Sequence, residues 1–386
     1  MNQNSHHRIA WLLPVAWFYW QPAISEFTKQ FPKTKVFTAL FPGFVQGFED
    51  TLDVRVVGEF KVVRSAEKSE GYNSRFTSLS PAIIGHLFQF KPQLIFSSSF
   101  GIWTILALLL KPIGAWKVVI VYEGSAPGVD FRNSSLRLTV RKMMIRAADA
   151  CISNTKAGRT YLTKILQSPE ESAFCQPFEI PAAKSLLENC QPVDLSHLPT
   201  NRPIFLFVGR IRERKGLHIL LQSCSLIKDK GYKNWTVLVV GDGEQREELE
   251  QYCQAQNLDN NVHWLGQVPY DQIAAYFRYA DVFVLPTKED TWGVVILEAM
   301  LFGKAILCST GAGSSELITD GENGYVFAHQ DSQKLAELML KFLQDSSLAV
   351  NMGEQSKKVM SAYTPEVAGQ FLVDVTKSVM NPSNLS

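Results

Sequence analysis

The sequence predicts an α/β fold of two doubly wound domains, each a parallel sheet with helices on both faces. Two observations carry this prediction. Short apolar runs of strand length alternate with longer amphipathic segments, and a proline-rich stretch without periodicity divides the chain. With 386 residues, of which 46% are hydrophobic and 19% charged, the chain is long and apolar enough for two cores of ordinary domain size.

The alternation is most regular in the second half of the chain. Each apolar run there is followed by a segment with helical periodicity, as right-handed β-α-β units require. The runs that we expect to be strands are 203–209, 236–241, 262–266, 281–286, 305–310 and 324–327.

The first half shows the same rhythm less cleanly. The candidate strands are 9–15, 35–40, 60–65, 93–99, 117–124 and 149–155. The helical stretches lie around 21–31, 101–110, 134–148 and 156–167. Residues 180–203 contain four prolines and no clear period, so we place a linker there, between domains at 1–182 and 200–363.

Charge is distributed unevenly although the net charge is only +1. Residues 1–182 hold 20 Lys/Arg against 13 Asp/Glu, giving +7, and the remainder hold 18 against 24, giving −6. A basic front half favours an anionic surface or substrate, although a solvated surface is the commoner meaning of such an excess.

Several features bear on the location of the protein. The six cysteines form no C-x-x-C motif and have no clustered histidines, which favours reduced thiols over a zinc site or disulfides. The apolar run 100–110 is about half the length that a membrane span needs. The first apolar run lacks a cleavage signal and is interpreted as a strand. We expect a cytoplasmic protein, or one at the inner face of a membrane.

The loop after the first strand of the second half reads GRIRERKG and begins at Gly209. It presents Arg210 and Lys215 before a helix, where an α/β domain offers backbone amides and cations to an anion. The loop has neither a G-x-G-x-x-G nor a Walker pattern, so neither nicotinamide nor ATP is favoured. A solvated charged turn is the alternative, and it is our interpretation of Arg212 and Arg214.

Residues 288–300 read KEDTWGVVILEAM. Asp290 or Thr291 can cap a helix that begins near Gly293, which would put Glu298 roughly two turns into it. Ionised carboxylates accept hydrogen bonds, so this pair suits the hydroxyl groups at two ends of a sugar-containing ligand. A structural cap plus a structurally paired Glu is the alternative.

Two further stretches have glycines after strands. Residues 308–324 place Gly311 and Gly313 before Glu316, where a phosphate or sugar could approach the backbone, or where the chain simply turns. Gly266 follows a strand and could form a ledge for a flat base.

Taken together, these motifs resemble family 4 retaining glycosyltransferases of the GT-B fold, the group 1 glycosyltransferases. GRIRERKG, the acidic pair around WGVVILEAM, and GAGSSELI with DGENG occur in the family's order and spacing over 200–345. The first half is similar only in its strand–helix rhythm and in RAADACISNTKAGRTYL.

The resemblance implies two Rossmann-like domains that face a central cleft, with the acceptor on the first domain and the donor on the second. The implied reaction moves a sugar from a nucleotide-diphosphate-sugar, of UDP or GDP, to an acceptor hydroxyl in polysaccharide or glycolipid assembly. No resident cofactor, metal or nucleic acid is implied. The helix-like segment 365–380 is expected to pack back on the first domain.

Carried over residue by residue, Arg210 and Lys215 match the pair that grips the diphosphate, and Glu298 matches the carboxylate that binds the ribose. Asp290 stands where the family usually has Glu and would contact the transferred sugar, with Glu289 as a competing candidate. The remaining donor-side matches are Gly209, Gly266, Gly293, Val294, Gly311, Gly313 and Glu316.

The first half departs from the family. The stretch 15–27 lacks the usual glycine pair, and Tyr122, Glu123 and Gly124 stand where many members have a histidine. Glu123 and Gly124 are therefore our acceptor-side candidates, with a loop-anchoring carboxylate as the alternative. A non-catalytic sugar-nucleotide-binding protein, a partner subunit or a GT-B nucleotide-sugar epimerase stays open.

The segment 134–149 carries Arg137, Arg141, Lys142 and Arg146 at spacings that cluster on one side of a helix. We predict that this basic face approaches an anionic membrane surface or a lipid-linked acceptor. A solvated helix face is the alternative.

Overall fold

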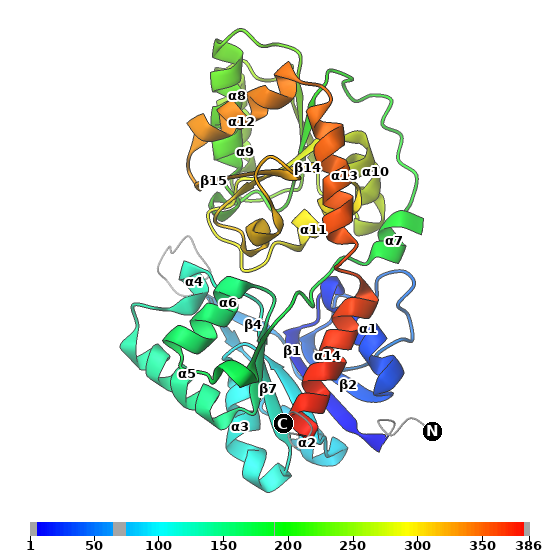
Figure 1. Ribbon diagram of the computed structural model, residues 1–386, viewed down its shortest axis with the longest axis vertical. Coiled ribbons are helices and arrows are strands. Elements are labelled where there is room, and N and C mark those ends of the chain that lie inside the picture. Colours follow the sequence, from blue (N-terminus) through cyan, green and yellow to red (C-terminus); the bar gives the residue numbers. More distant parts are fainter. Residues whose placement is uncertain (1–5, 65–74, 189, 382–386) are drawn as a thin grey trace. The chain divides into compact units, whose positions relative to one another are not determined.

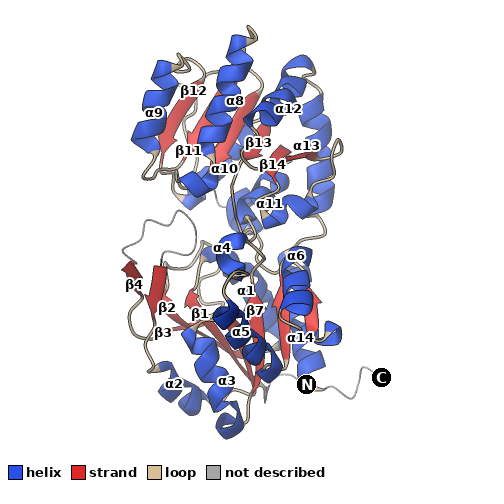
Figure 2. Ribbon diagram, turned by 90° about the vertical axis from the view of Figure 1, so that its left-hand side faces the viewer, coloured by secondary structure: helices blue, strands red, loops and turns tan. Residues whose placement is uncertain are grey.

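The computed structural model describes residues 6–64, 75–188 and 190–381. The chain forms two compact units (Figures 1 and 2). Unit 1 comprises the residues up to Ala182 together with those from Tyr363 onward, and unit 2 comprises Ala183–Ala362. Each unit is an α/β structure built on a parallel sheet, which confirms the predicted fold class.

Unit 1 contains a seven-stranded sheet in which all neighbouring strands are parallel. Its strands, in spatial order, are β3 (Asp53–Val56), β2 (Lys33–Leu40), β1 (Arg8–Val15), β6 (Leu94–Ser98), β7 (Lys117–Tyr122), β8 (Ala150–Ser153) and β9 (Ala173–Cys175). The strand order reverses between β1 and β6, so ligands of such a sheet are expected at the carboxyl ends there.

One strand prediction in unit 1 is wrong in its placement. The predicted strand 60–65 is β4 (Lys61–Arg64), which pairs antiparallel with β5 (Arg75–Ser78) in a separate two-stranded sheet. The outer strand of the main sheet is instead β3, whose residues are mostly exposed because it has a neighbour on one side only. Its sequence DVRV therefore lacks the continuous apolar run of a central strand.

The helices of unit 1 lie on both faces of its sheet. They are α1 (Gln21–Gln30), α2 (Ile83–Phe90), α3 (Ile102–Gly114), α4 (Pro127–Asp130), α5 (Ser135–Ala147), α6 (Lys156–Thr160) with a π turn at Tyr161–Ile165, and α14 (Pro365–Met380). Helices α2, α3 and α5 bury their inner faces in one core with the sheet. Helix α14 lies against α1, where a side chain in place of Gly369 would meet Glu26 (Figure 1).

The outward basic face predicted for 134–149 requires a correction. Arg141 is buried, and its guanidinium donates hydrogen bonds to the Asp130 carbonyl at 3.0 Å and the Tyr161 hydroxyl at 2.9 Å. The rings of Phe100 and Phe131 lie against it. Arg141 is therefore part of the packing beneath α5, because aromatic faces and two oxygens can satisfy a buried guanidinium.

Unit 2 contains a six-stranded, fully parallel sheet, and all six predicted runs are confirmed as its strands. In spatial order they are β12 (Val262–Gly266), β11 (Thr236–Val240), β10 (Ile204–Val208), β13 (Val282–Leu285), β14 (Ala305–Ser309) and β15 (Gly324–Phe327). The order reverses between β10 and β13, so the loops that follow these two strands leave the sheet side by side.

The helices of unit 2 complete its layers. They are α7 (Ala183–Glu188), α8 (Leu217–Asp229), α9 (Arg246–Ala255), α10 (Ile273–Tyr279), α11 (Val294–Leu301), α12 (Ser332–Gln344) and α13 (Leu348–Met360). Helix α7 lies within the stretch that we predicted to be a linker without periodicity. With six residues, this helix is too short to show a clear helical period in the sequence.

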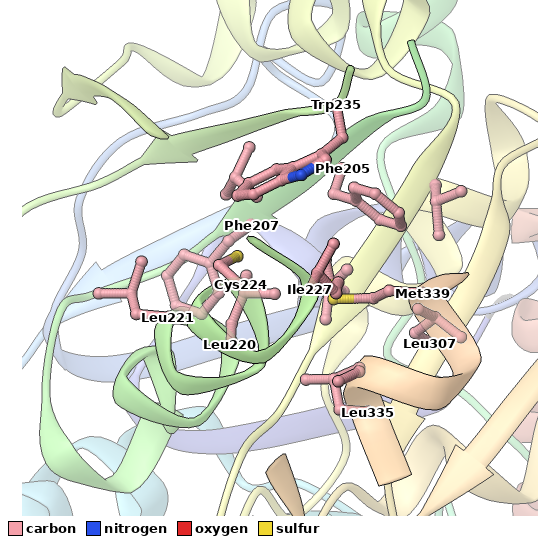
Figure 3. Packing of buried hydrophobic residues seen from close by; sticks show 14 of the residues in the cluster. Phe205, Phe207, Leu220, Leu221, Cys224, Ile227, Trp235, Leu307, Leu335 and Met339 are labelled. Carbon is pink, nitrogen blue, oxygen red and sulfur yellow. The ribbon is translucent and has the colours of Figure 1, made fainter. Parts of the chain in front are cut away.

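The core of unit 2 lies between its sheet and helices α8 and α12 (Figure 3). Leu220, Cys224 and Ile227 recur along α8 at helical spacing and pack toward Phe205 of β10, with Met339 of α12 beside them. Fully burying a large apolar side chain contributes about 1.5–3 kcal/mol, so this layer holds β10 and its following loop in a fixed position. Among the described residues, no helix combines the length and apolarity of a membrane span.

Candidate functional site

Three loops of unit 2 meet at the carboxyl edge of its sheet. They follow β10, β13 and β14, which are consecutive neighbours in the sheet. Most of the residues singled out from the sequence of unit 2 lie on these loops or on helix α11 directly after the second of them.

Arg214 joins the first loop to the second. Its guanidinium donates to the Glu289 carbonyl at 2.6 Å, and its own carbonyl accepts from the Lys288 amide at 2.8 Å. The buried Thr287 hydroxyl donates to the same carbonyl at 2.9 Å. Our interpretation of Arg214 as a solvated turn residue is therefore wrong. Neither Arg214 nor Thr287 stands out in the sequence, since both act through backbone groups of a distant loop.

Glycines allow the three loops to approach at backbone distance. Gly216 has φ +70°, and a Cβ there would lie 1.9 Å from the Pro286 carbonyl oxygen. A Cβ at Gly311 would lie 2.4 Å from the Thr287 carbonyl oxygen. Any larger residue at either position would force the loops apart. Gly311 thus has a packing role whatever it does toward a ligand, and Gly216 was missed because a glycine at a helix start is common.

The third loop holds the second through a short run of backbone hydrogen bonds. The Asp290 amide donates to the Gly311 carbonyl at 2.8 Å, and the Asp290 carbonyl accepts from the Gly313 amide at 2.9 Å. The Ser314 amide donates to the Trp292 carbonyl at 2.7 Å, and the Trp292 side chain is buried. The backbone of Asp290 is consequently fixed on both sides.

The side chain of Asp290 forms an ion pair with Lys215. The ammonium donates to Oδ2 at 2.5 Å, and the two side chains are only 16% and 11% exposed. Burial alone would raise the pKa of Asp290, but the charges of Lys215 and Arg214 outweigh it and the pKa is lowered. Asp290 is therefore an ionised acceptor at neutral pH.

The predicted helix cap requires a correction. Helix α11 begins at Val294 after Gly293, which has φ +86°, and neither Asp290 nor Thr291 caps it with its side chain. The Asp290 carboxylate instead pairs with Lys215 and accepts a hydrogen bond from the backbone amide of Trp292, which precedes Gly293. The first amides of α11 therefore have no side-chain cap, which is the situation in which a helix start can receive an anion.

Glu298 is buried and lies about one turn into α11, closer to the loop than the two turns that we predicted. Burial raises the pKa of Glu298 to about 7, although a hydrogen bond with Tyr270 acts in the opposite direction. The two carboxylates of the motif thus differ: Asp290 has a cation beside it, whereas Glu298 has none among the residues that the structure describes.

The remaining polar candidates lie on the same three loops, outside the Lys215–Asp290 pair. Arg210 is exposed, and no carboxylate in the described part of the chain pairs with it. Arg212, by contrast, lies 3.2 Å from Glu244. Glu289 is buried beside Asp290. Glu316 is exposed on a 3-10 turn (Gly313–Leu317), so it is on the rim of the three-loop site rather than inside it.

Gly209 directly follows β10, and Gly266 is the last residue of β12, at the same edge of the sheet. The Gly209 amide donates to the Val240 carbonyl at 3.0 Å, and the Gly266 carbonyl accepts from the Gly241 amide at 2.7 Å. A Cβ at Gly241 would lie 1.9 Å from the Gly209 carbonyl oxygen. Sequence reasoning missed Gly241, although a glycine directly after an apolar run was a usable signal.

The acceptor-side candidates lie in unit 1, at the carboxyl end of β7. The Glu123 carbonyl accepts from the Asn154 amide at 3.3 Å, and Gly124 is buried beside it. The buried Asp130 organises this loop, accepting from the Tyr122 hydroxyl at 2.5 Å and from Arg132 at 2.8 Å. Burial and the Asp130 charge raise the pKa of Tyr122, which stays a neutral donor.

The sequence of unit 2 also matches a known family. Residues 195–359, less than half of the chain, match the model of glycosyl transferases group 1. Unit 2 therefore contains a group 1 glycosyl transferase domain. The three-loop site described above belongs to this group 1 domain, since its loops fall between residues 209 and 314.

Curated relatives match over similar lengths. The chain is 27% identical over 180 residues to the alpha-D-kanosaminyltransferase of Streptomyces kanamyceticus, covering 46% of each chain. It is 29% identical over 167 residues to the 2-deoxystreptamine N-acetyl-D-glucosaminyltransferase of Niallia circulans, covering 43% of this chain and 41% of that one. The chain thus matches less than half the length of both relatives.

Solved structures match over nearly the whole chain. Anabaena Alr3699/HepE in complex with UDP has a TM-score of 0.73 at 18% identity, covering 96% of this chain and 100% of that chain. Sucrose-phosphate synthase from Thermosynechococcus elongatus has a TM-score of 0.72 at 19% identity, covering 98% and 100%. At these identities the likeness concerns the fold, and the predicted GT-B fold is confirmed.

Proposed function

We propose that this chain is a retaining glycosyltransferase that moves a sugar from a nucleotide-diphosphate-sugar to an acceptor hydroxyl, in polysaccharide or glycolipid assembly. One observation carries the proposal. At the carboxyl edge of the sheet in the matched domain, Lys215 pairs with the buried Asp290. Arg210 lies on the same loop as Lys215, and the buried Glu298 lies on α11, which begins directly after the Asp290 loop.

The cations suit a diphosphate leaving group. Breaking the bond between sugar and diphosphate builds negative charge on the departing oxygen, and prepositioned cations and amides stabilise that charge. Arg210 pairs with no carboxylate in the described ranges of the chain, and the Lys215 ammonium has three donors of which Asp290 uses one. Each contact of this kind typically lowers the barrier by about 3–4 kcal/mol.

The carboxylates suit the hydroxyls at the two ends of the donor. Asp290, ionised and fixed by its backbone, is assigned to the transferred sugar, with Glu289 next to it. Glu298 is assigned to the ribose. Because burial raises the pKa of Glu298 to about 7, ribose hydroxyls that donate to it would favour its ionised form.

The reaction proposed for this site retains the anomeric configuration. The acceptor hydroxyl attacks the sugar carbon as the diphosphate leaves, and the leaving phosphate oxygen takes the acceptor proton. Glu123 and Gly124 of unit 1 are the acceptor-side candidates. The complex of the structurally similar Anabaena protein with UDP supports a UDP-sugar as the first donor to test.

The test begins with the intact protein and a thermal-shift screen of UDP-, GDP- and ADP-sugars. The best donor is then incubated with candidate acceptors, the product is identified by mass spectrometry, and its anomeric configuration is determined by NMR. We expect a product with the donor's configuration. Binding of nucleotide diphosphate without turnover would indicate a non-catalytic protein, an epimer formed without acceptor would indicate an epimerase, and an inverted product would refute retention.

A further inference from the structure

Helices α3 and α5 of unit 1 expose an unusual amount of apolar surface. Of the fourteen large apolar side chains that are exposed among the described residues, three lie on each of these helices. They are Ile102, Leu109 and Ile113 on α3, and Leu136, Val140 and Met143 on α5. Leu109, Ile113, Leu136 and Met143 are 70%, 74%, 73% and 63% exposed, so none of these four is part of a core. We call these six side chains the α3–α5 face.

The helical spacing places each set of three on the outer side of its helix. The positions recur at intervals of seven and four residues on α3 and of four and three residues on α5, which keeps each set within one stripe. The inner sides of both helices, with Trp103 and Ala107 of α3 and Met144 of α5, pack in the same core. The two stripes therefore point away from the same side of the sheet.

The two helices are neighbours and are tied together at their ends. The Lys111 ammonium near the end of α3 donates to the Ala147 carbonyl at the end of α5, at 2.9 Å. Both views show α3 and α5 side by side on one side of the sheet (Figures 1 and 2). The α3–α5 face is thus one continuous region of two helices, not two scattered sets.

The charged side chains on these two helices have one sign. Neither helix contains Asp or Glu, whereas α5 carries Arg137, Lys142 and Arg146 beside its stripe. In the described part of the chain, no carboxylate pairs with these three cations. Lys111 and Lys117 are different, because both pair with Asp149, at 2.7 Å and 3.1 Å.

We propose that the α3–α5 face binds the surface of an anionic lipid bilayer, with its apolar side chains inserted at the headgroup boundary. Exposed apolar patches of this kind mark interaction surfaces, and an apolar stripe bordered by Lys and Arg is the pattern of helices that lie in an anionic membrane interface. A second copy of the chain fits less well, because a symmetric contact would bring the same unpaired cations together.

This inference corrects and extends the sequence prediction of a basic membrane-facing helix. The side chains proposed to enter the membrane are apolar, and they belong to both α3 and α5, whereas the sequence prediction concerned α5 alone. Arg141, which that prediction included, is buried and is not part of the face. The inference also stands apart from the proposed donor site. The α3–α5 face belongs to unit 1, and the donor-site residues belong to unit 2.

The test is co-sedimentation of the full chain with vesicles of phosphatidylcholine alone or mixed with phosphatidylglycerol. We expect binding to the mixed vesicles only. The double variant Leu109→Gln/Met143→Gln should reduce this binding at least tenfold. Both positions are exposed, so folding should be unaffected, as thermal unfolding and binding of nucleotide diphosphate would show. Val350→Gln, at an exposed apolar position of unit 2, is the matched control and should bind as the wild type does.

A second variant separates the electrostatic part. Lys142→Gln/Arg146→Gln should weaken binding at low salt, and the difference from the wild type should shrink at about 0.5 M salt, where exposed charges are screened. The proposal is overturned if the wild type does not bind the mixed vesicles, or if Leu109→Gln/Met143→Gln binds them unchanged. It is also overturned if the wild type is a dimer that this variant converts to a monomer without any vesicle binding.

Discussion

The carboxyl edges of the two sheets are built differently although the sheets share a doubly wound topology. In unit 2, backbone hydrogen bonds, close glycine contacts and the Arg214 side chain together join three loops, with Asp290 bonded to Gly311 and Gly313 and with Gly216 against Pro286. In unit 1, a side chain joins the start of α1 to the loop after β2. The buried Gln21 amide donates to the Gly43 carbonyl at 2.8 Å and accepts from the Val45 amide at 2.9 Å.

This difference decides which side chains each edge has left for a ligand. Among the described residues, Arg210 of unit 2 pairs with no carboxylate, and Glu298 has no cation beside it. In unit 1 the polar Gln21 is used internally, and the exposed side chains on the same loops include Trp17 and Phe44. The chain after β1 and β2 in unit 1 thus presents aromatic side chains, whereas the loops after β10 and β13 in unit 2 hold charged ones.

The largest effect is expected for Lys215→Ala. It removes a proposed diphosphate contact and leaves the Asp290 carboxylate buried without its partner. Breaking a buried pair from one side costs about 3–5 kcal/mol, and losing the leaving-group contact costs a hundredfold or more in rate. Urea unfolding and kcat/KM for the donor would measure the two losses separately.

A double variant distinguishes the two roles of Lys215. In Lys215→Ala/Asp290→Asn the buried charge is gone, so most of the stability should return while activity stays low. Unchanged stability of Lys215→Ala would show that the pair does not hold the loops in solution.

Glu298→Gln should raise stability and weaken donor binding. The pKa of Glu298 is raised from 4.5 to about 7, so the folded protein keeps its proton at pH values where the unfolded chain has lost it. The wild type therefore loses stability as pH rises from 4.5 to 7, by at most about 3 kcal/mol, and this loss is constant above pH 7.

Thermal unfolding of both proteins from pH 5 to 8 measures this effect. The difference in stability between Glu298→Gln and the wild type should be small near pH 5, grow up to pH 7 and then level off. Donor affinity of the wild type should rise from pH 6 to 8 as Glu298 ionises, whereas that of the variant should stay flat. An advantage of equal size at every pH would contradict the assignment.

The same contrast explains how much the sequence could predict. The strands of unit 2 were predictable because strands buried on both faces are continuous apolar runs. Strands β3 and β9 in unit 1 were not, since one is an exposed edge and the other has three residues. Arg210, Lys215 and Asp290 were identified from motifs. The Lys215–Asp290 pair and the contacts of Arg214 were not, because each joins residues about 75 positions apart in the chain.

Arg210→Ala tests a unit 2 charge that does not contribute to holding the fold together. The side chain is exposed and has no carboxylate partner among the described residues, so the free energy of unfolding should change by less than about 0.5 kcal/mol. Donor kcat/KM should fall about tenfold to a hundredfold. Arg212→Ala is the matched control, since Arg212 pairs with Glu244, and it should keep near-normal activity. Equal losses in both variants would show that only the net charge of the loop matters.

The smallest effect on donor binding and activity is expected for Gln21→Ala in unit 1. The substitution leaves the Val45 amide and the Gly43 carbonyl without the buried partner that joins their loop to α1. We expect a loss of about 1–2 kcal/mol in stability and no change in the affinity for nucleotide diphosphate. Gln30→Ala on the same helix loses only an exposed hydrogen bond with Gln370 and should cost less than about 0.5 kcal/mol. If Gln21→Ala weakened donor binding as strongly as it weakened stability, the contacts of Gln21 would also support the donor site, and the division of roles between the two edges would be wrong.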